Sequence, residues 1–172
     1  MTLLDELREG IRKKEEQERS LGGRVLLFGP ADEKGKRKRR NLAARLKRIG
    51  FEVHNSESLS RSVSSFLTAY QQEEEHWRLF DQILILNFSH GASQEIAAFV
   101  HDPEFRRRAY VVYPERFDPV YSTSFGSEVL RGYPFKERVT EEEWENCKAS
   151  DKCLDFARAR RAIDVELLSR TP

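Results

Sequence analysis

The chain has 172 residues, of which 38% are hydrophobic and 34% charged, with a formal net charge of +1 at pH 7. That length can bury a sizeable core, while the near-neutral charge excludes a strong overall attraction to nucleic acid. The apolar runs fall far short of the roughly 20 residues that span a bilayer, and two cysteines are too few for a disulfide framework. The N-terminus lacks the basic-then-apolar order of residues that is typical of a signal peptide. We therefore expect a cytoplasmic protein with no membrane contact.

The first element is expected to be a helix over residues 3–20. Its first half carries leucine and isoleucine at helical spacing, whereas residues 13–19 are entirely polar, so only the first half can bury a face. We therefore divide the chain into an N-terminal helical extension, residues 1–21, and an α/β domain with a C-terminal helix, residues 22–172. The extension is expected to pack on this domain or on a second subunit.

Strand-forming and helical segments then alternate along the chain. Strands are expected over Arg24–Phe28 and over residues 51–54, 83–86 and 108–113. After a polar loop over residues 31–40, helices are expected up to a C-terminal cap at Gly50 and over residues 63–79 and 93–100. This β-α-β-α-β-α-β order favours a parallel sheet with helices on both faces.

The pattern is weaker beyond Pro114. Residues 117–133 are expected to be irregular with a short helix near Val129, residues 136–139 to form an edge strand, and residues 153–168 to form a final amphipathic helix. We therefore predict a single-domain, three-layer α/β/α sandwich with a mostly parallel sheet of about four to five strands, flanked by N- and C-terminal helices.

The most informative segment is the junction after the strand at residues 83–86. A short polar turn containing Gly91 leads into a helix for which Ser93 is a plausible N-cap and Glu95 a first-turn residue. Ligands of open parallel sheets bind beyond the carboxyl ends of the strands. Glu95 is therefore either a residue that the helix dipole favours or a functional carboxylate, and His90 is either a turn residue or a proton donor.

A basic run over residues 34–40 follows the first strand and its Gly29-Pro30 turn. The run does not form a Walker motif, because the glycine spacing is wrong and Arg37 replaces the hydroxyl that would hold magnesium. It is either a solvated loop and first helical turn or a phosphate contact, with Lys36 and Arg37 as candidate ligands. Nucleic acid is not the expected partner, because no aromatic residues interleave with the cations as platforms for stacked bases.

Metal binding is not expected either. The four histidines are dispersed, and five residues separate Cys147 from Cys153, which is not the spacing of paired ligands. Trp77 and Trp144 are expected to be packing residues.

Several of these residues together resemble a known family. A first strand ending in Gly29-Pro30, an aspartate (Asp81) just before the third strand, and a turn from Gly91 to Glu95 that opens a helix are similar to the nucleoside 2-deoxyribosyltransferase-like group. That group is a structural cousin of Toll/interleukin-receptor (TIR) domains. The resemblance covers roughly residues 24–113.

The resemblance implies a flavodoxin/TIR-like fold and assigns roles to individual residues. Glu95 matches the glutamate that attacks the anomeric carbon in the transferases or supports cleavage of the nicotinamide-ribose bond in TIR-type NAD hydrolases. His90, beside the turn, is the candidate proton donor. The residues expected to bind the ligand are Gly29, Pro30, Asp81, Ser89, Gly91 and Ser93.

The function expected on this basis is the handling of a nucleoside or nucleotide, with hydrolysis or transfer at an N-glycosidic bond. No cofactor is required for this chemistry, and NAD or another nucleotide is a candidate substrate or ligand. The resemblance also implies a homo-oligomer. The alternative is a TIR-like module that senses a nucleotide or binds a protein partner without catalysis.

Overall fold

The computed structural model describes residue 9 and residues 23–56, 77–120 and 124–169. The expected N-terminal helix and most of the helix expected over residues 63–79 lie outside the described residues. So do the side chains of Glu95, Leu168 and Ser169, which belong to helices whose backbone is described.

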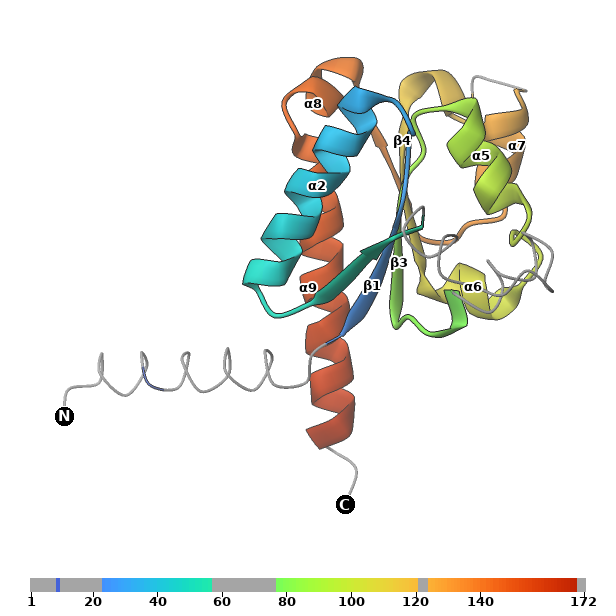
Figure 1. Cartoon of the computed structure of the whole chain (residues 1–172). Coiled ribbons are helices and arrows are strands. Elements are labelled where there is room, and N and C mark those ends of the chain that lie inside the picture. The colour runs from blue at the N-terminus through green and yellow to red at the C-terminus, as the bar shows by residue number, and fades with distance from the viewer. Residues whose placement is uncertain (1–8, 10–22, 57–76, 121–123, 170–172) are drawn as a thin grey trace, which may run out of the picture.

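The centre of the fold is a five-stranded sheet in which every neighbouring pair of strands is parallel. The strand order is β2-β1-β3-β4-β5. Figure 1 shows the sheet, whose strands are β1 (Arg24–Phe28), β2 (Glu52–Asn55), β3 (Gln82–Leu86), β4 (Ala109–Pro114) and β5 (Lys136–Val139). The predicted parallel sheet is confirmed, including its edge strand β5.

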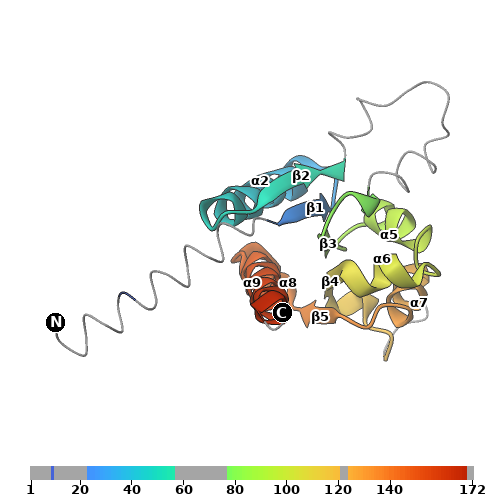
Figure 2. The same cartoon turned by 90° about the horizontal axis from the view of Figure 1, so that it is seen from below.

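Helices cover both faces of the sheet (Figures 1 and 2). One face carries α2 (Glu33–Arg48), α8 (Glu141–Glu145) and α9 (Lys148–Ser169). The other carries α5 (His90–Ala97), α6 (Pro103–Arg108) and α7 (Phe125–Arg131), with the short 3-10 helix η1 (Glu115–Phe117) after β4. The predicted α/β/α sandwich is therefore confirmed. Within the described part of the chain, no helix is both long and apolar enough to cross a membrane.

The core divides into two halves because successive side chains of a strand point to opposite faces of the sheet. In β1, Val25 and Leu27 belong to the cluster under α2, α8 and α9, whereas Leu26 and Phe28 belong to the cluster under α5, α6 and α7. Every residue of the central strand β3 is buried. The expected packing role of Trp77 is confirmed, because it is fully buried with its ring centroid 5.3 Å from that of Phe105.

Helix α2 begins earlier than the sequence predicted, so the expected polar loop over residues 31–40 was wrong. Asp32 caps the helix by accepting a hydrogen bond from the Gly35 backbone N–H at 2.7 Å. The sequence did not predict the first turns of this helix, because the basic residues there show no apolar periodicity. The side chains of two of them nevertheless pack inward, since Lys38 and Arg39 are buried. The predicted end of this helix is correct, with Gly50 at a φ of 93° just beyond it.

Two further helices differ from the prediction. Helix α6 was missed, although Asp102 caps it through bonds from the backbone N–H groups of Glu104 (2.8 Å) and Phe105 (3.1 Å). Phe105 is its one buried residue, so no apolar period marked it. Helix α9 begins at Lys148, five residues before the expected start, because its first turn is small and polar.

The junction of β1 with α2 gives a test of this packing. A Cβ on Gly35 would lie 2.6 Å from the Pro30 Cβ and 2.6 Å from the Pro30 carbonyl oxygen. We expect Gly35→Ala to lower the free energy of unfolding by about 1–3 kcal/mol, because the helix must move away from the loop. Urea denaturation of the two proteins measures the difference.

Gly91→Ala is the matched control. Gly91 is also a helical glycine, but a Cβ there would meet nothing nearer than the Ser89 hydroxyl oxygen at 3.9 Å. We expect this change to be neutral or to stabilise by up to about 1 kcal/mol, because alanine is the better helix former. Equal effects of the two substitutions would contradict the proposed close contact.

Candidate functional site

The strand order reverses direction between β1 and β3. From β1 the chain crosses to β2 on one side and later returns to β3 on the other. The segments that leave β1 and β3 enter helices on opposite faces of the sheet, α2 and α5 (Figure 1). Open α/β sheets form a crevice at such a point, beyond the carboxyl ends of the strands, and ligands bind there. We call this region, formed by residues 29–32 and 87–91, the switch-point edge.

The loop after β1 is held close to both of its neighbours. A Cβ on Gly29 would lie 3.1 Å from Arg39 Cδ and 3.2 Å from Leu86 Cβ, so only a glycine fits without displacement. The Pro30 carbonyl accepts a hydrogen bond from Arg39 Nη2 at 3.1 Å. Gly29 and Pro30 are both buried. The structure therefore gives these two predicted ligand residues a packing role at the switch-point edge.

The loop after β3 starts helix α5 three residues earlier than the sequence indicated. Ser89, with extended backbone angles, is the N-cap, and its hydroxyl accepts a hydrogen bond from the Ala92 N–H at 3.2 Å. The assignment of Ser93 as N-cap was therefore wrong, and Glu95 lies in the second turn of α5. Weak helix formers in the first turn concealed the true start. His90 and Gly91 are exposed beside Ser89.

Ser93 instead belongs to a buried polar pair. Its hydroxyl donates to the Asn87 side-chain oxygen at 2.8 Å, and both residues are 0% exposed. Gly126 of α7 packs directly on it, since a Cβ there would lie 3.1 Å from Ser93 Oγ. The Ser93 hydroxyl is thus enclosed within the fold, and this pair ties α5 to the end of β3.

Asp81 is not part of the switch-point edge. It precedes β3, and its carboxylate accepts a hydrogen bond from the Arg24 backbone N–H at 2.8 Å, at the start of β1. The five residues of β3 separate the two edges of the sheet, a distance of about 17 Å at roughly 3.3 Å per residue. The inclusion of Asp81 among the ligand residues is corrected: its role is to satisfy the first backbone donor of β1.

Aromatic and cationic side chains surround the loop after β3. The His90 ring lies 5.9 Å from the Phe117 ring, and the Arg116 guanidinium lies 5.1 Å from the same ring. Arg116 also donates to the Phe88 carbonyl oxygen at 2.9 Å. On the other side, Phe88 stacks on Trp144 at 3.8 Å, which confirms the packing role of Trp144. Arg116 is also ion-paired with Glu141. His90 is therefore an exposed imidazole next to the Phe117 ring at the edge of the sheet.

The basic run of α2 is largely engaged within the fold. Lys34 forms an ion pair with Glu145. The buried amino group of Lys38 donates to the Trp144 carbonyl oxygen and to the Glu145 carbonyl oxygen, the latter at 3.0 Å. These bonds satisfy carbonyl groups at the end of α8. The interpretation of the run as a solvated loop was therefore wrong for Lys38 and for Arg39.

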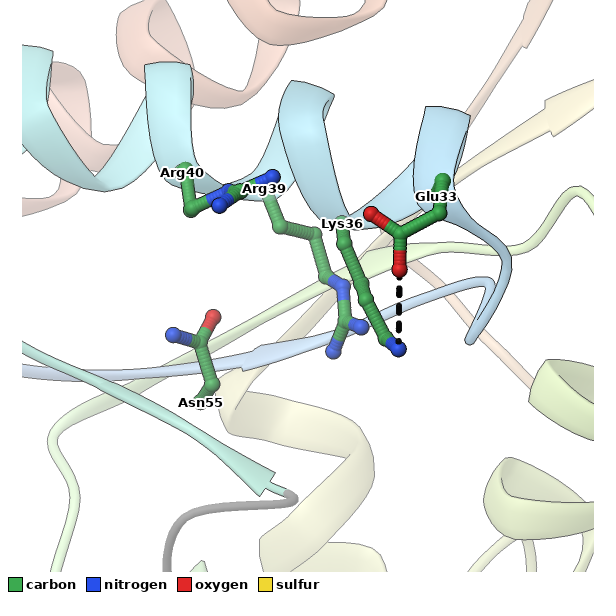
Figure 3. A pocket seen from close by; sticks show the side chains of 5 residues that line it. All are labelled: Glu33, Lys36, Arg39, Arg40 and Asn55. Atoms are coloured by element: carbon green, nitrogen blue, oxygen red, sulfur yellow. Dashed lines mark hydrogen bonds and ion pairs between the residues drawn. The ribbon is translucent and has the colours of Figure 1, made fainter.

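Three cations of the run, Lys36, Arg39 and Arg40, line a pocket between α2 and the end of β2. It has a volume of about 240 Å³, and its lining residues are Glu33, Lys36, Arg39, Arg40 and Asn55 (Figure 3). We call it the basic pocket. Lys36 is the only predicted phosphate ligand in it, because Arg37 lines a separate depression. Arg40 was missed, although it is four residues from Lys36 and so on the same helix face.

Comparisons with known proteins provide no further assignment. The chain matches no model of a known protein family, and no curated protein is significantly similar to it. Among the residues that the structure describes, no group of three or more histidine, cysteine, aspartate or glutamate side chains could hold a metal ion. The similarity to deoxyribosyltransferases therefore stays a hypothesis based on the residues quoted above.

The buried Asn87–Ser93 pair can be tested by mutation. Ser93→Ala removes the only hydrogen-bond donor identified for the Asn87 side-chain oxygen in the described structure. We expect a loss of about 1–3 kcal/mol in the free energy of unfolding, because a buried acceptor is left unsatisfied.

Urea denaturation again provides the measurement. Gln94→Ala, at the exposed position next along α5, should stay within about 0.5 kcal/mol of the parent chain. A Ser93→Ala variant as stable as the Gln94→Ala variant would show that the pair does not stabilise the switch-point edge.

Proposed function

We propose that this protein binds a nucleoside or nucleotide at the switch-point edge and hydrolyses its N-glycosidic bond. The observation that carries the proposal is the reversal of strand order between β1 and β3. It coincides with the Gly29-Pro30 turn and with the start of the segment from Gly91 to Glu95, the two segments that resemble the deoxyribosyltransferase-like group. Ligand sites in doubly wound sheets lie at this reversal.

The chemistry needs one carboxylate and one proton donor. Cleavage breaks the bond between the anomeric carbon and the base nitrogen through an oxocarbenium-like state, and water supplies the hydroxyl group of the released sugar. In the proposed reaction Glu95 stabilises the positive charge at the anomeric carbon or captures that carbon covalently. His90 donates the proton that the departing base takes up.

Two observations support these roles. Glu95 lies on α5, the helix that starts at the switch-point edge. His90 is the first residue of the same helix and is exposed there.

The second candidate function is a module that binds a nucleotide without turnover. Two observations favour it. Glu95 belongs to the second turn of α5, farther from the edge than the sequence indicated, and Ser93, one of the expected ligand residues, is enclosed within the fold. A binding module needs only the pocket and its polar lining.

Substitution of Glu95 tests the enzymatic proposal. We expect the purified chain to release the base from NAD or a nucleoside, and Glu95→Gln to reduce that rate by about a hundredfold or more, because the charge that stabilises the transition state is removed. Chromatographic measurement of the released nicotinamide or base follows the reaction.

Glu128→Gln is the control, because it removes one carboxylate from another helix, α7, where Glu128 is exposed. It should leave the rate unchanged, and both variants should melt at the temperature of the parent chain. Nucleotides that raise the melting temperature without any product would support the binding module instead. An unchanged rate in Glu95→Gln would remove Glu95 from the mechanism.

A further inference from the structure

We infer that the basic pocket binds the phosphate group of a nucleotide, so that the preferred ligand is a nucleotide and not a nucleoside. The identity of the rest of the ligand depends on the proposed function, whereas the phosphate site does not. The site consists of Lys36, Arg39 and Arg40 from α2 and Asn55 from the end of β2.

The charges of the lining favour an anion. Among the described residues that line the pocket, three cationic side chains and one carboxylate, Glu33, give an excess of two positive charges. The Glu33–Lys36 ion pair is long, at 3.4 Å, and the Glu33 side chain is 84% exposed. Such an exposed ion pair is weak, so Lys36 can exchange Glu33 for a bound anion of higher charge. A phosphate monoester carries close to two negative charges and can accept several charge-assisted hydrogen bonds.

The geometry of the lining also suits phosphate. Lys36, Arg39 and Arg40 are spaced i, i+3 and i+4, so they share one face of α2. Figure 3 shows Lys36 and Arg39 extending from the helix in the same direction, with Asn55 opposite them on β2. Arg39 is 2% exposed and its Nη2 is fixed on the Pro30 carbonyl oxygen. A guanidinium held in this way loses little freedom when it binds an anion.

The neighbouring depression is the weaker candidate. It is lined by Glu33, Lys34, Arg37 and Arg40 on the same helix. Lys34 is already paired with Glu145, and none of the described residues that line the depression lies on a strand. The basic pocket, in contrast, joins the helix to the carboxyl end of β2.

The position of the pocket indicates a small ligand. Arg39 links it directly to the Gly29-Pro30 turn, because the same side chain lines the pocket, contacts Gly29 and bonds Pro30. A nucleotide could therefore place its phosphate in the basic pocket and its sugar at the switch-point edge. None of the described residues that line the pocket is aromatic, so they offer a nucleic acid strand no stacking platform.

Binding of adenosine and AMP to the full chain tests the inference. We expect calorimetry to give a Kd for AMP at least about tenfold lower than that for adenosine, because charge-assisted hydrogen bonds form only with the phosphate. The double variant Lys36→Gln/Arg40→Gln changes two side chains that are not buried. It should bring the AMP affinity to that of adenosine and leave adenosine binding unchanged.

Two single variants serve as controls. Arg37→Gln removes an equal charge from the adjacent depression and should change AMP binding by less than about threefold, because exposed charges outside the site are screened. Glu33→Gln removes the one carboxylate among the described lining residues of the basic pocket and should tighten AMP binding. Equal losses in Arg37→Gln and in the double variant would mean that general charge attracts the ligand, and would overturn the inference.

The experiment also separates this inference from the proposed function. Inorganic phosphate that binds the chain, and is lost in the double variant, supports the pocket even if no nucleoside is bound or cleaved. Adenosine that binds as tightly as AMP overturns the pocket while the nucleoside site stands. Binding of single-stranded RNA that strengthens with strand length and depends on Lys36 and Arg40 would also overturn it, because the ligand would then be a strand.

Discussion

The close approach of helix α2 to the end of strand β1 is the contact on which the rest of this structure depends. Gly29 and Gly35 have no side chains where the loop, the helix and β3 meet, and a Cβ at either position would displace a neighbour. This approach lets Arg39 reach the Pro30 carbonyl oxygen. It also brings the cationic face of α2 over the end of β2, so one packing constraint produces both the switch-point edge and the basic pocket.

On the opposite face, helix α5 is fixed by polar contacts where it meets the sheet. The buried Asn87–Ser93 hydrogen bond and the Ser89 cap set its starting position, and Gly126 of α7 packs against Ser93. Buried polar groups are held in one arrangement because a lost partner leaves a desolvated atom. The position of Glu95 relative to the edge therefore depends on this pair, which links the stability of the loop to the proposed chemistry.

The sequence predicted those features that a single segment can encode. The strands β1, β3 and β4 are apolar runs bounded by glycine, proline or polar residues, and their alternation with helices favoured a parallel sheet. The sequence did not predict which side chains contact residues in other segments of the chain. Arg39 looked like one cation in a loop because its partner, Pro30, is in the preceding turn, and Asp81 looked like a ligand residue because nothing local shows that Arg24 lies beside it.

By itself, the sequence determined the class of the fold, the order of the strands and the polar turn after β3, since local apolar periods and turn residues encode them. Only the tertiary structure decided which end of the sheet each polar residue occupies, where α5 begins, and which cations of α2 meet in one pocket. Those properties depend on hydrogen bonds and packing between segments far apart in the chain, and such contacts leave no periodic pattern in the sequence.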